Sequence, residues 1–175
     1  TGNSGKDWEG LASIVDSTGT VGGINQATSG NGFWASTETA QGGAVTTAAL
    51  AKLYNDVSVG NDQPTMIITT QDVYQDYEAL LTDQIRYTDT DVADAGFQNL
   101  LFKGAPVVFD GACTAQTVYM INNKYLRLVG HRDVWFKPTP FVRPTDQDAV
   151  FSQILTYGNL TCSNRARQGK LTGVT

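Results

Sequence analysis

The segment Pro64-Thr65-Met66-Ile67-Ile68-Thr69-Thr70 is the strongest indication of the fold. Its apolar, β-branched run is too short for a helix and is typical of a strand that is buried on both faces. Thr70 can cap a following helix over residues 71–83, in which apolar side chains recur along one side. A strand followed directly by an amphipathic helix predicts a sheet with helices packed on it.

Three further segments precede this strand. Residues 45–59 carry apolar residues at helical spacing and are followed by Gly60, which predicts a helix. Residues 4–15 predict a shorter amphipathic helix that begins at Ser4. Between them, residues 16–43 are rich in Gly, Ser, Thr, Asn and Gln and have no clear periodicity. That stretch indicates either a flap that becomes ordered against a neighbouring molecule or a loose surface hairpin.

The second half of the chain is predicted to be mostly antiparallel strands. They cover residues 100–103, 106–109, 117–121 and 125–129, and the last two are expected to pair as a hairpin through Asn122-Asn123. Three prolines exclude a central strand over residues 136–144 and favour an edge or an extended crossover. Residues 148–163 predict a long strand or hairpin with a bulge at Gly158. The fold class expected from these elements is α+β.

The charge of the chain excludes a nucleic-acid-binding domain. Its 175 residues include 17 Asp and Glu against 12 Lys and Arg, a net charge of -5, whereas such domains need a clustered basic face. The basic residues concentrate only in residues 164–170, where we expect a solvated turn or a salt-bridging contact with an acidic neighbour. No apolar run approaches the roughly 20 residues that span a bilayer. Few charges overall favour a surface that contacts other protein.

Few residues are available for catalysis or metal binding. His131 is the single histidine, so a two-His metal site is excluded. Cys113 and Cys162 are either a disulfide pair or two buried small apolar groups. The acidic residues of 87–95 lack the Gly position and the closing Glu of a calcium loop, and they indicate a solvated loop. We therefore expect no cofactor and no catalytic residue.

Several short motifs follow one another in the order found in major capsid proteins of tailed bacteriophages. They include Gly22-Gly23-Ile24 with Phe33-Trp34, Gln63-Pro64-Thr65-Met66-Ile67-Ile68, Phe102-Lys103-Gly104-Ala105-Pro106-Val107-Val108-Phe109-Asp110, Tyr119-Met120-Ile121-Asn122, and Gly158-Asn159-Leu160-Thr161-Cys162. The chain resembles that family over nearly its whole length.

The resemblance implies the mixed α+β fold that these capsid proteins share with encapsulins. It implies an axial domain over residues 1–135 and a C-terminal return to the peripheral domain over residues 136–175. The N-terminal arm, extended loop and spine helix of the family would all precede Thr1. We therefore expect this chain by itself to form monomers or small oligomers rather than shells.

The function implied by the resemblance is that of a structural subunit of an icosahedral phage or prophage head. Such a subunit assembles with copies of itself into pentamers and hexamers and encloses double-stranded DNA without binding it specifically. It meets scaffold, portal or decoration proteins, and it resides in the host cytoplasm during assembly and then in the virion. The candidate interface residues are Phe33, Trp34, Asp110, Gly111, Ala112, Cys113, Arg165 and Arg167, and residues 110–116 are a candidate axis-facing loop.

Two alternatives from other classes remain open at this point. A carbohydrate-binding or adhesion β domain is suggested by the many Thr, Asn and Gln residues and the three Trp residues. A hydrolase centred on His131 is the third alternative, because a histidine beside Arg132 and Asp133 could act as a polarised base.

Overall fold

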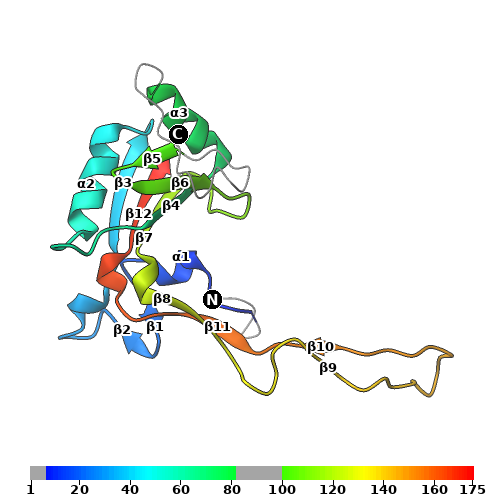
Figure 1. Cartoon of the computed structure of the whole chain (residues 1–175). Coiled ribbons are helices and arrows are strands. Elements are labelled where there is room, and N and C mark those ends of the chain that lie inside the picture. Colours follow the sequence, from blue (N-terminus) through cyan, green and yellow to red (C-terminus); the bar gives the residue numbers. More distant parts are fainter. Residues whose placement is uncertain (1–6, 82–99) are drawn as a thin grey trace.

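A six-stranded mixed sheet forms the body of the molecule, which is a computed structural model that describes residues 7–81 and 100–175 (Figure 1). The strands run in the order β3-β12-β7-β4-β6-β5. Their bounds are β3 (Thr37–Gly43), β4 (Met66–Thr69), β5 (Leu100–Phe102), β6 (Ala105–Phe109), β7 (Thr117–Ile121) and β12 (Gly169–Val174). β12 is parallel to β3 and β4 is parallel to β6, whereas the remaining pairs are antiparallel. The predicted α+β class is confirmed.

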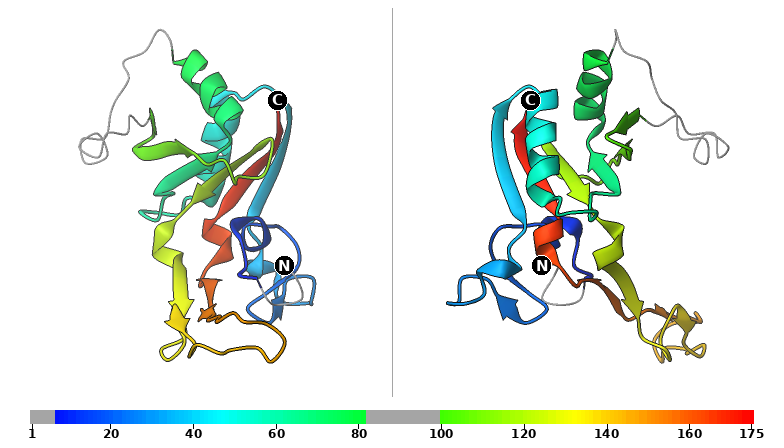
Figure 2. Two further views of the ribbon diagram at one scale, coloured as in Figure 1. Left: turned by 90° about the vertical axis from the view of Figure 1, so that its right-hand side faces the viewer. Right: turned by 60° about the vertical axis from the view of Figure 1, so that its left-hand side comes forward.

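The two faces of the sheet bury different parts of the chain. Along β7, Val118 and Met120 face a cluster that includes α2 (Thr47–Val57) and α3 (Gln71–Leu80). Tyr119 and Ile121 face a second cluster that includes α1 (Leu11–Ile14). Alternate side chains of a strand point to opposite faces, so a strand covered on both sides is apolar throughout. Figure 2 shows α2 and α3 together on one side of the sheet.

The predicted strand and its flanking helices are confirmed with small changes at their ends. Residues 65–69 contain β4, residues 71–83 contain α3, and residues 45–59 contain α2. The helix predicted over residues 4–15 is shorter, because residues 7–10 are not helical and only α1 forms; Ser4 lies outside the described residues.

The β5–β6 hairpin turns through Lys103 and Gly104. Both residues have positive φ, 48° and 86°, which is the geometry of a type I′ turn. Glycine adopts this conformation without steric cost, so Gly104 is suited to the second turn position. The strands expected on either side of Gly104 are confirmed.

The hairpin predicted between residues 117–121 and 125–129 is wrong. β7 pairs with β4 and β12, so neither of its edges is free for another strand. After Asn122 the chain turns through the short helix η3 (Asn123–Tyr125), and the Asn122 side chain accepts a hydrogen bond from the Lys124 main-chain nitrogen at 3.1 Å. The following strand, β8 (Leu126–Gly130), therefore leaves the sheet and pairs with β11 (Gly158–Cys162).

Two segments that were expected to be irregular each contribute a strand to the six-stranded sheet. Residues 16–43 contain β1 (Thr20–Val21), β2 (Ile24–Asn25), the short helix η2 (Gly32–Trp34) and the edge strand β3. Residues 164–170 are not a solvated turn, because the short helix η4 (Arg165–Arg167) leads directly into β12, which lies between β3 and β7. A division at residue 135 thus cuts across one sheet, since residues 169–174 pair with residues 37–43.

A long hairpin over residues 126–162 extends from the body (Figure 1). Its stem is the β8–β11 pair, and its outer part pairs β9 (Lys137–Pro138) with β10 (Ile154–Leu155). The extended character predicted for residues 136–144 is confirmed. Residues 148–163 form the returning arm of this hairpin, as the predicted long strand would, and not a hairpin of their own. Gly158 is not a bulge, because it lies directly opposite Gly130 in continuous register. Among the helices of the described segments, none has both the length and the apolar character needed to cross a membrane.

Candidate subunit interface

The long hairpin exposes an unusual number of large apolar side chains. Nine large apolar residues of the hairpin are about half exposed or more: Leu128, Val129, Phe136, Phe141, Val142, Val150, Phe151, Ile154 and Tyr157. Phe141 and Ile154 are the most exposed, at 78% and 70%. Soluble monomers rarely expose contiguous apolar surface on this scale, and such a surface marks a site of contact with another molecule.

Two pairs of opposed residues on the outer hairpin contribute to this surface. Val142 is opposite Phe151, and Pro138 is opposite Ile154. Directly opposed residues of an antiparallel pair project to the same face. Each pair therefore presents two apolar side chains together to solvent, and no other described part of the chain covers them.

The predicted loop at residues 110–116 is exposed at its tip. Asp110, Gly111 and Ala112 are exposed, and Cys113 is half-buried. The Asp110 carboxylate accepts a hydrogen bond from the Ala112 main-chain nitrogen at 2.9 Å, which gives the tip a defined turn. The tip and α1 line an open hollow of about 290 Å³.

The other predicted interface residues divide into exposed and buried positions. Phe33 is 64% exposed, but Trp34 is buried and its indole nitrogen donates to the main-chain oxygen of Val21 at 3.0 Å. Arg167 is half-buried and reaches the main-chain oxygen of Val57 at 3.4 Å.

Arg165 is not a surface residue, and its selection as an interface residue is corrected. Its side chain is fully buried and donates four hydrogen bonds to main-chain oxygens: Ile14 at 2.9 Å, Trp34 at 3.0 Å, Asp16 at 2.8 Å and Thr18 at 3.0 Å. The structure thus brings together two predicted residues, Trp34 and Arg165, as a support inside the chain. The salt bridge expected in this region is made by Lys170, with Asp16 at 2.8 Å and Glu38 at 3.3 Å.

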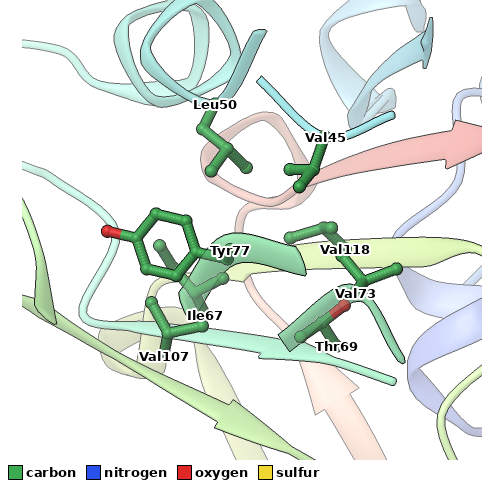
Figure 3. Close-up of a pocket in the computed structure, with 8 residues that line it drawn as sticks. All are labelled: Val45, Leu50, Ile67, Thr69, Val73, Tyr77, Val107 and Val118. Atoms are coloured by element: carbon green, nitrogen blue, oxygen red, sulfur yellow. The ribbon is translucent and has the colours of Figure 1, made fainter. Parts of the chain in front are cut away.

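The cavity between the sheet and its helices is a packing defect (Figure 3). Its volume is about 10 Å³, which is at the lower limit for a single water molecule. Seven of its lining side chains are hydrocarbon or aromatic, and the hydroxyl of the eighth, Thr69, already donates to the Thr117 oxygen. This cavity cannot hold a substrate.

The described residues contain no cluster of three or more His, Cys, Asp and Glu side chains that could hold a metal ion. Cys113 and Cys162 are free thiols, and burial raises the pKa of both, so they favour the unreactive protonated form. His131 is exposed. The acidic loop of residues 87–95 lies outside the described residues.

No protein-family model and no curated protein sequence matches this chain. Solved structures, by contrast, do match this chain. A chain in the capsid asymmetric unit of cyanophage A-1(L) superimposes with a TM-score of 0.66 at 18% identity, over 91% of this chain and 55% of that chain. The chain has the capsid fold. The holo-SrpI encapsulin of Synechococcus elongatus also matches it, with a TM-score of 0.58 at 12% identity, over 79% of this chain and 52% of that chain.

These two matches confirm the resemblance noted in the sequence at the level of the fold. The chain spans about half the length of each matched shell protein. The exposed apolar surface of the long hairpin was not predicted from the sequence, where residues 136–144 were expected to be an edge or an extended crossover. Phe136, Phe141 and Phe151, placed between prolines and polar residues, were the available signal.

Proposed function

We propose that this chain is a structural subunit of an icosahedral phage head that assembles with copies of itself and encloses double-stranded DNA. The observation that carries the proposal is the long hairpin, a projecting apolar surface on a capsid fold. Fully burying one large apolar side chain is worth about 1.5–3 kcal/mol, so several such side chains can hold subunits together. Symmetric repetition of that contact then makes a stable closed shell from individually modest interfaces.

The partner of the long hairpin in this proposal is the body of a second copy. Residues 126–162 contain four basic and three acidic residues, a net charge of +1, whereas the rest of the chain contains eight and fourteen, a net charge of -6. The four basic side chains are exposed, and none is within ion-pair distance of an acidic group among the described residues. Opposite charge favours contact between the hairpin of one copy and the body of the next, which is a head-to-tail arrangement that can close into pentamers and hexamers.

The axial and peripheral domains expected from the resemblance are proposed here with a changed boundary, because residues 169–174 belong to the main sheet. We propose that the sheet with α1, α2 and α3 is the axial domain and that the long hairpin belongs to the peripheral domain. The candidate axis-facing loop remains residues 110–116, where Gly111 and Ala112 stand exposed. Scaffold, portal and decoration proteins are proposed further partners, and the virion is the proposed final location.

A head subunit and an encapsulin differ in what the shell contains. The net charge of -5 suits a shell that encloses DNA without retaining it, because phosphate binding needs clustered basic side chains. Particles isolated from the cells that produce this protein should contain double-stranded DNA of one length. Particles that contain only a protein cargo would replace the phage-head proposal with an encapsulin.

The role of the long hairpin is tested by self-association. Phe141→Ser and Ile154→Ser should each shift sedimentation velocity profiles toward monomer across a concentration series. Val59→Ser is the matched control, since Val59 is 56% exposed on the body and should have no effect. If the hairpin variants keep the urea midpoint of the unmodified chain and still associate as it does, the long hairpin is not the contact between copies.

A further inference from the structure

Two facing glycines mark the point where the long hairpin leaves its stem. Gly130 and Gly158 are register partners at the end of the β8–β11 pair. The indole ring of Trp135 lies against both: a β-carbon on Gly130 would be 2.2 Å from the ring atom Cε3, and one on Gly158 would be 3.0 Å from Cζ3. Real β-carbons essentially never approach another atom as closely as 2.2 Å, so the ring occupies the space that a side chain at Gly130 would need. At Gly158 a β-carbon would also lie 2.8 Å from the main-chain oxygen of Val129.

A second tryptophan, from the other end of the chain, covers this ring. The rings of Trp8 and Trp135 are stacked, with centroids 5.8 Å apart and planes inclined by 14°. Phe136 also packs against Trp135 in an edge-to-face arrangement, with ring centroids 5.2 Å apart. The main-chain nitrogen of Glu9 also donates to Oδ1 of Asn159 at 2.7 Å. Among the described residues before α1, Trp8 and Glu9 therefore attach to the root of the hairpin, through a ring contact and a hydrogen bond.

The other hydrogen bonds at the root of the hairpin join its two sides to each other. The main-chain nitrogen of His131 donates to the main-chain oxygen of Tyr157 at 2.7 Å, and the main-chain nitrogen of Tyr157 donates to that of Val134 at 2.9 Å. These main-chain bonds hold the two sides of the hairpin together but do not attach it to the body. Its direction relative to the body then depends on the stem and on the contacts made by Trp8 and Glu9.

We propose that residues 7–9 are a latch that sets the direction of the long hairpin, with Trp8 as the positioning residue and the Gly130–Gly158 pair as the pivot. When Trp8 is stacked on Trp135, the root is fixed in the orientation seen here. When the segment before α1 moves and withdraws Trp8, the hairpin gains freedom to rotate about the glycine pair. The segment before α1 thereby controls where the apolar surface of the hairpin is presented.

The latch is tested on the chain in solution, independently of whether it forms shells. Spin labels at Asp146→Cys near the hairpin end and Gln75→Cys on α3, in a Cys113→Ala and Cys162→Ala background, report the direction as a distance distribution. Both labelled positions are exposed. Trp8→Ala should broaden that distribution at least twofold and remove the near-ultraviolet circular dichroism of the stacked pair, whereas Trp8→Phe should largely preserve the narrow distribution.

Two companion variants keep this test decisive. Gly130→Ala should push the Trp135 ring away from its stack with Trp8 and so broaden the distance distribution in the same way. Phe33→Ala removes an exposed aromatic ring of the body and should leave the distribution unchanged. A narrow, unshifted distribution in folded Trp8→Ala, judged by an unchanged urea midpoint, would overturn the latch while leaving the proposed shell function intact.

Discussion

The Nε atom of Arg165 donates a hydrogen bond to the main-chain oxygen of Ile14 at 2.9 Å, across a separation of 151 residues. The same guanidinium also bonds to the oxygens of Trp34, Asp16 and Thr18. Arginine presents its donors in a rigid planar fork, so one buried side chain can satisfy several diverging carbonyl groups. Arg165, in the short helix η4 before β12, thus fixes the segment that runs from α1 to η2.

Replacement of Arg165 should be strongly destabilising. Arg165→Met leaves four main-chain oxygens without this donor, and we expect a loss of about 3 kcal/mol or more in the free energy of unfolding. Arg165→Lys should recover only part of it, because one ammonium group cannot reach all four oxygens. Urea unfolding is the measurement, and Arg127→Met, at an exposed position, is the control, with a change within about 0.5 kcal/mol. Equal effects at the two positions would contradict the supporting role of Arg165.

The ion pair between Asp16 and Lys170 should make stability depend on acid pH. Partial burial acts to raise the pKa of Asp16, but hydrogen bonds from Lys170 and Thr18 outweigh it and lower the pKa from 3.8 to about 2. A lowered folded-state pKa contributes stability that is present above pH 3.8 and is lost as the pH falls toward 2. After allowance for solvent screening, the contribution is roughly 1–2 kcal/mol.

Asp16→Asn measures this contribution directly. The difference in the free energy of unfolding between the unmodified chain and Asp16→Asn should be largest above pH 4 and should shrink as the pH approaches about 2. Denaturant titrations at several pH values provide the comparison. A difference that stays constant throughout this range would show that the carboxylate charge is not what the pair contributes.

Close packing at Gly169 should limit substitution where β12 begins. A β-carbon there would lie 2.7 Å from Cγ1 of Val57 and 3.0 Å from Cδ1 of Leu53 on α2. Gly169→Ala should therefore cost about 1–3 kcal/mol through overpacking. Leu53→Ala alone should cost about 2–5 kcal/mol, because it leaves a cavity at a fully buried position.

The double variant separates overpacking from other causes. The added methyl group can occupy the space left by Leu53, so the combined loss should be smaller than the sum by about 1 kcal/mol. Gly111→Ala is the control, because a β-carbon there meets no heavy atom within 4 Å. If the two losses in the free energy of unfolding add exactly in a double-mutant cycle, the strain caused by Gly169→Ala does not arise from contact with Leu53.

The two helix caps should differ in their contribution to stability. Thr46 accepts a hydrogen bond from the Ala49 main-chain nitrogen at 3.2 Å, whereas the side chain of Thr70 makes no capping bond at α3. Thr46→Ala should lower the free energy of unfolding by about 1 kcal/mol, and Thr70→Ala should lower it by less. Thermal unfolding of the matched pair measures the contrast. A larger loss at Thr70 would contradict the assigned caps.

Local sequence was informative wherever neighbouring residues carry the structural signal. The apolar run at β4 and the periodic spacing of α2 and α3 predicted these elements. Side-chain alternation and helix spacing are short-range properties, so a single pass along the chain detects them.

Strand partners were not predictable in the same way. β3 has the polar sequence TETAQGG, which carries no apolar pattern, and it is a strand because β12 pairs with it. The pairing of β7 with β12 instead of β8 likewise depends on residues about 50 positions away. Pairing over such distances is decided by packing of the whole chain, which local propensity does not report.

The candidate interface shows the same contrast between composition and placement. Scarce charges indicated a surface for protein contact, yet Arg165 and Trp34, chosen from sequence, are buried supports of the fold. The sequence by itself determined an α+β domain with few charges and the order of its main elements. Only the tertiary structure decided which strands pair, which arginine is buried, and where apolar side chains stay exposed, because each depends on contacts between residues distant in sequence.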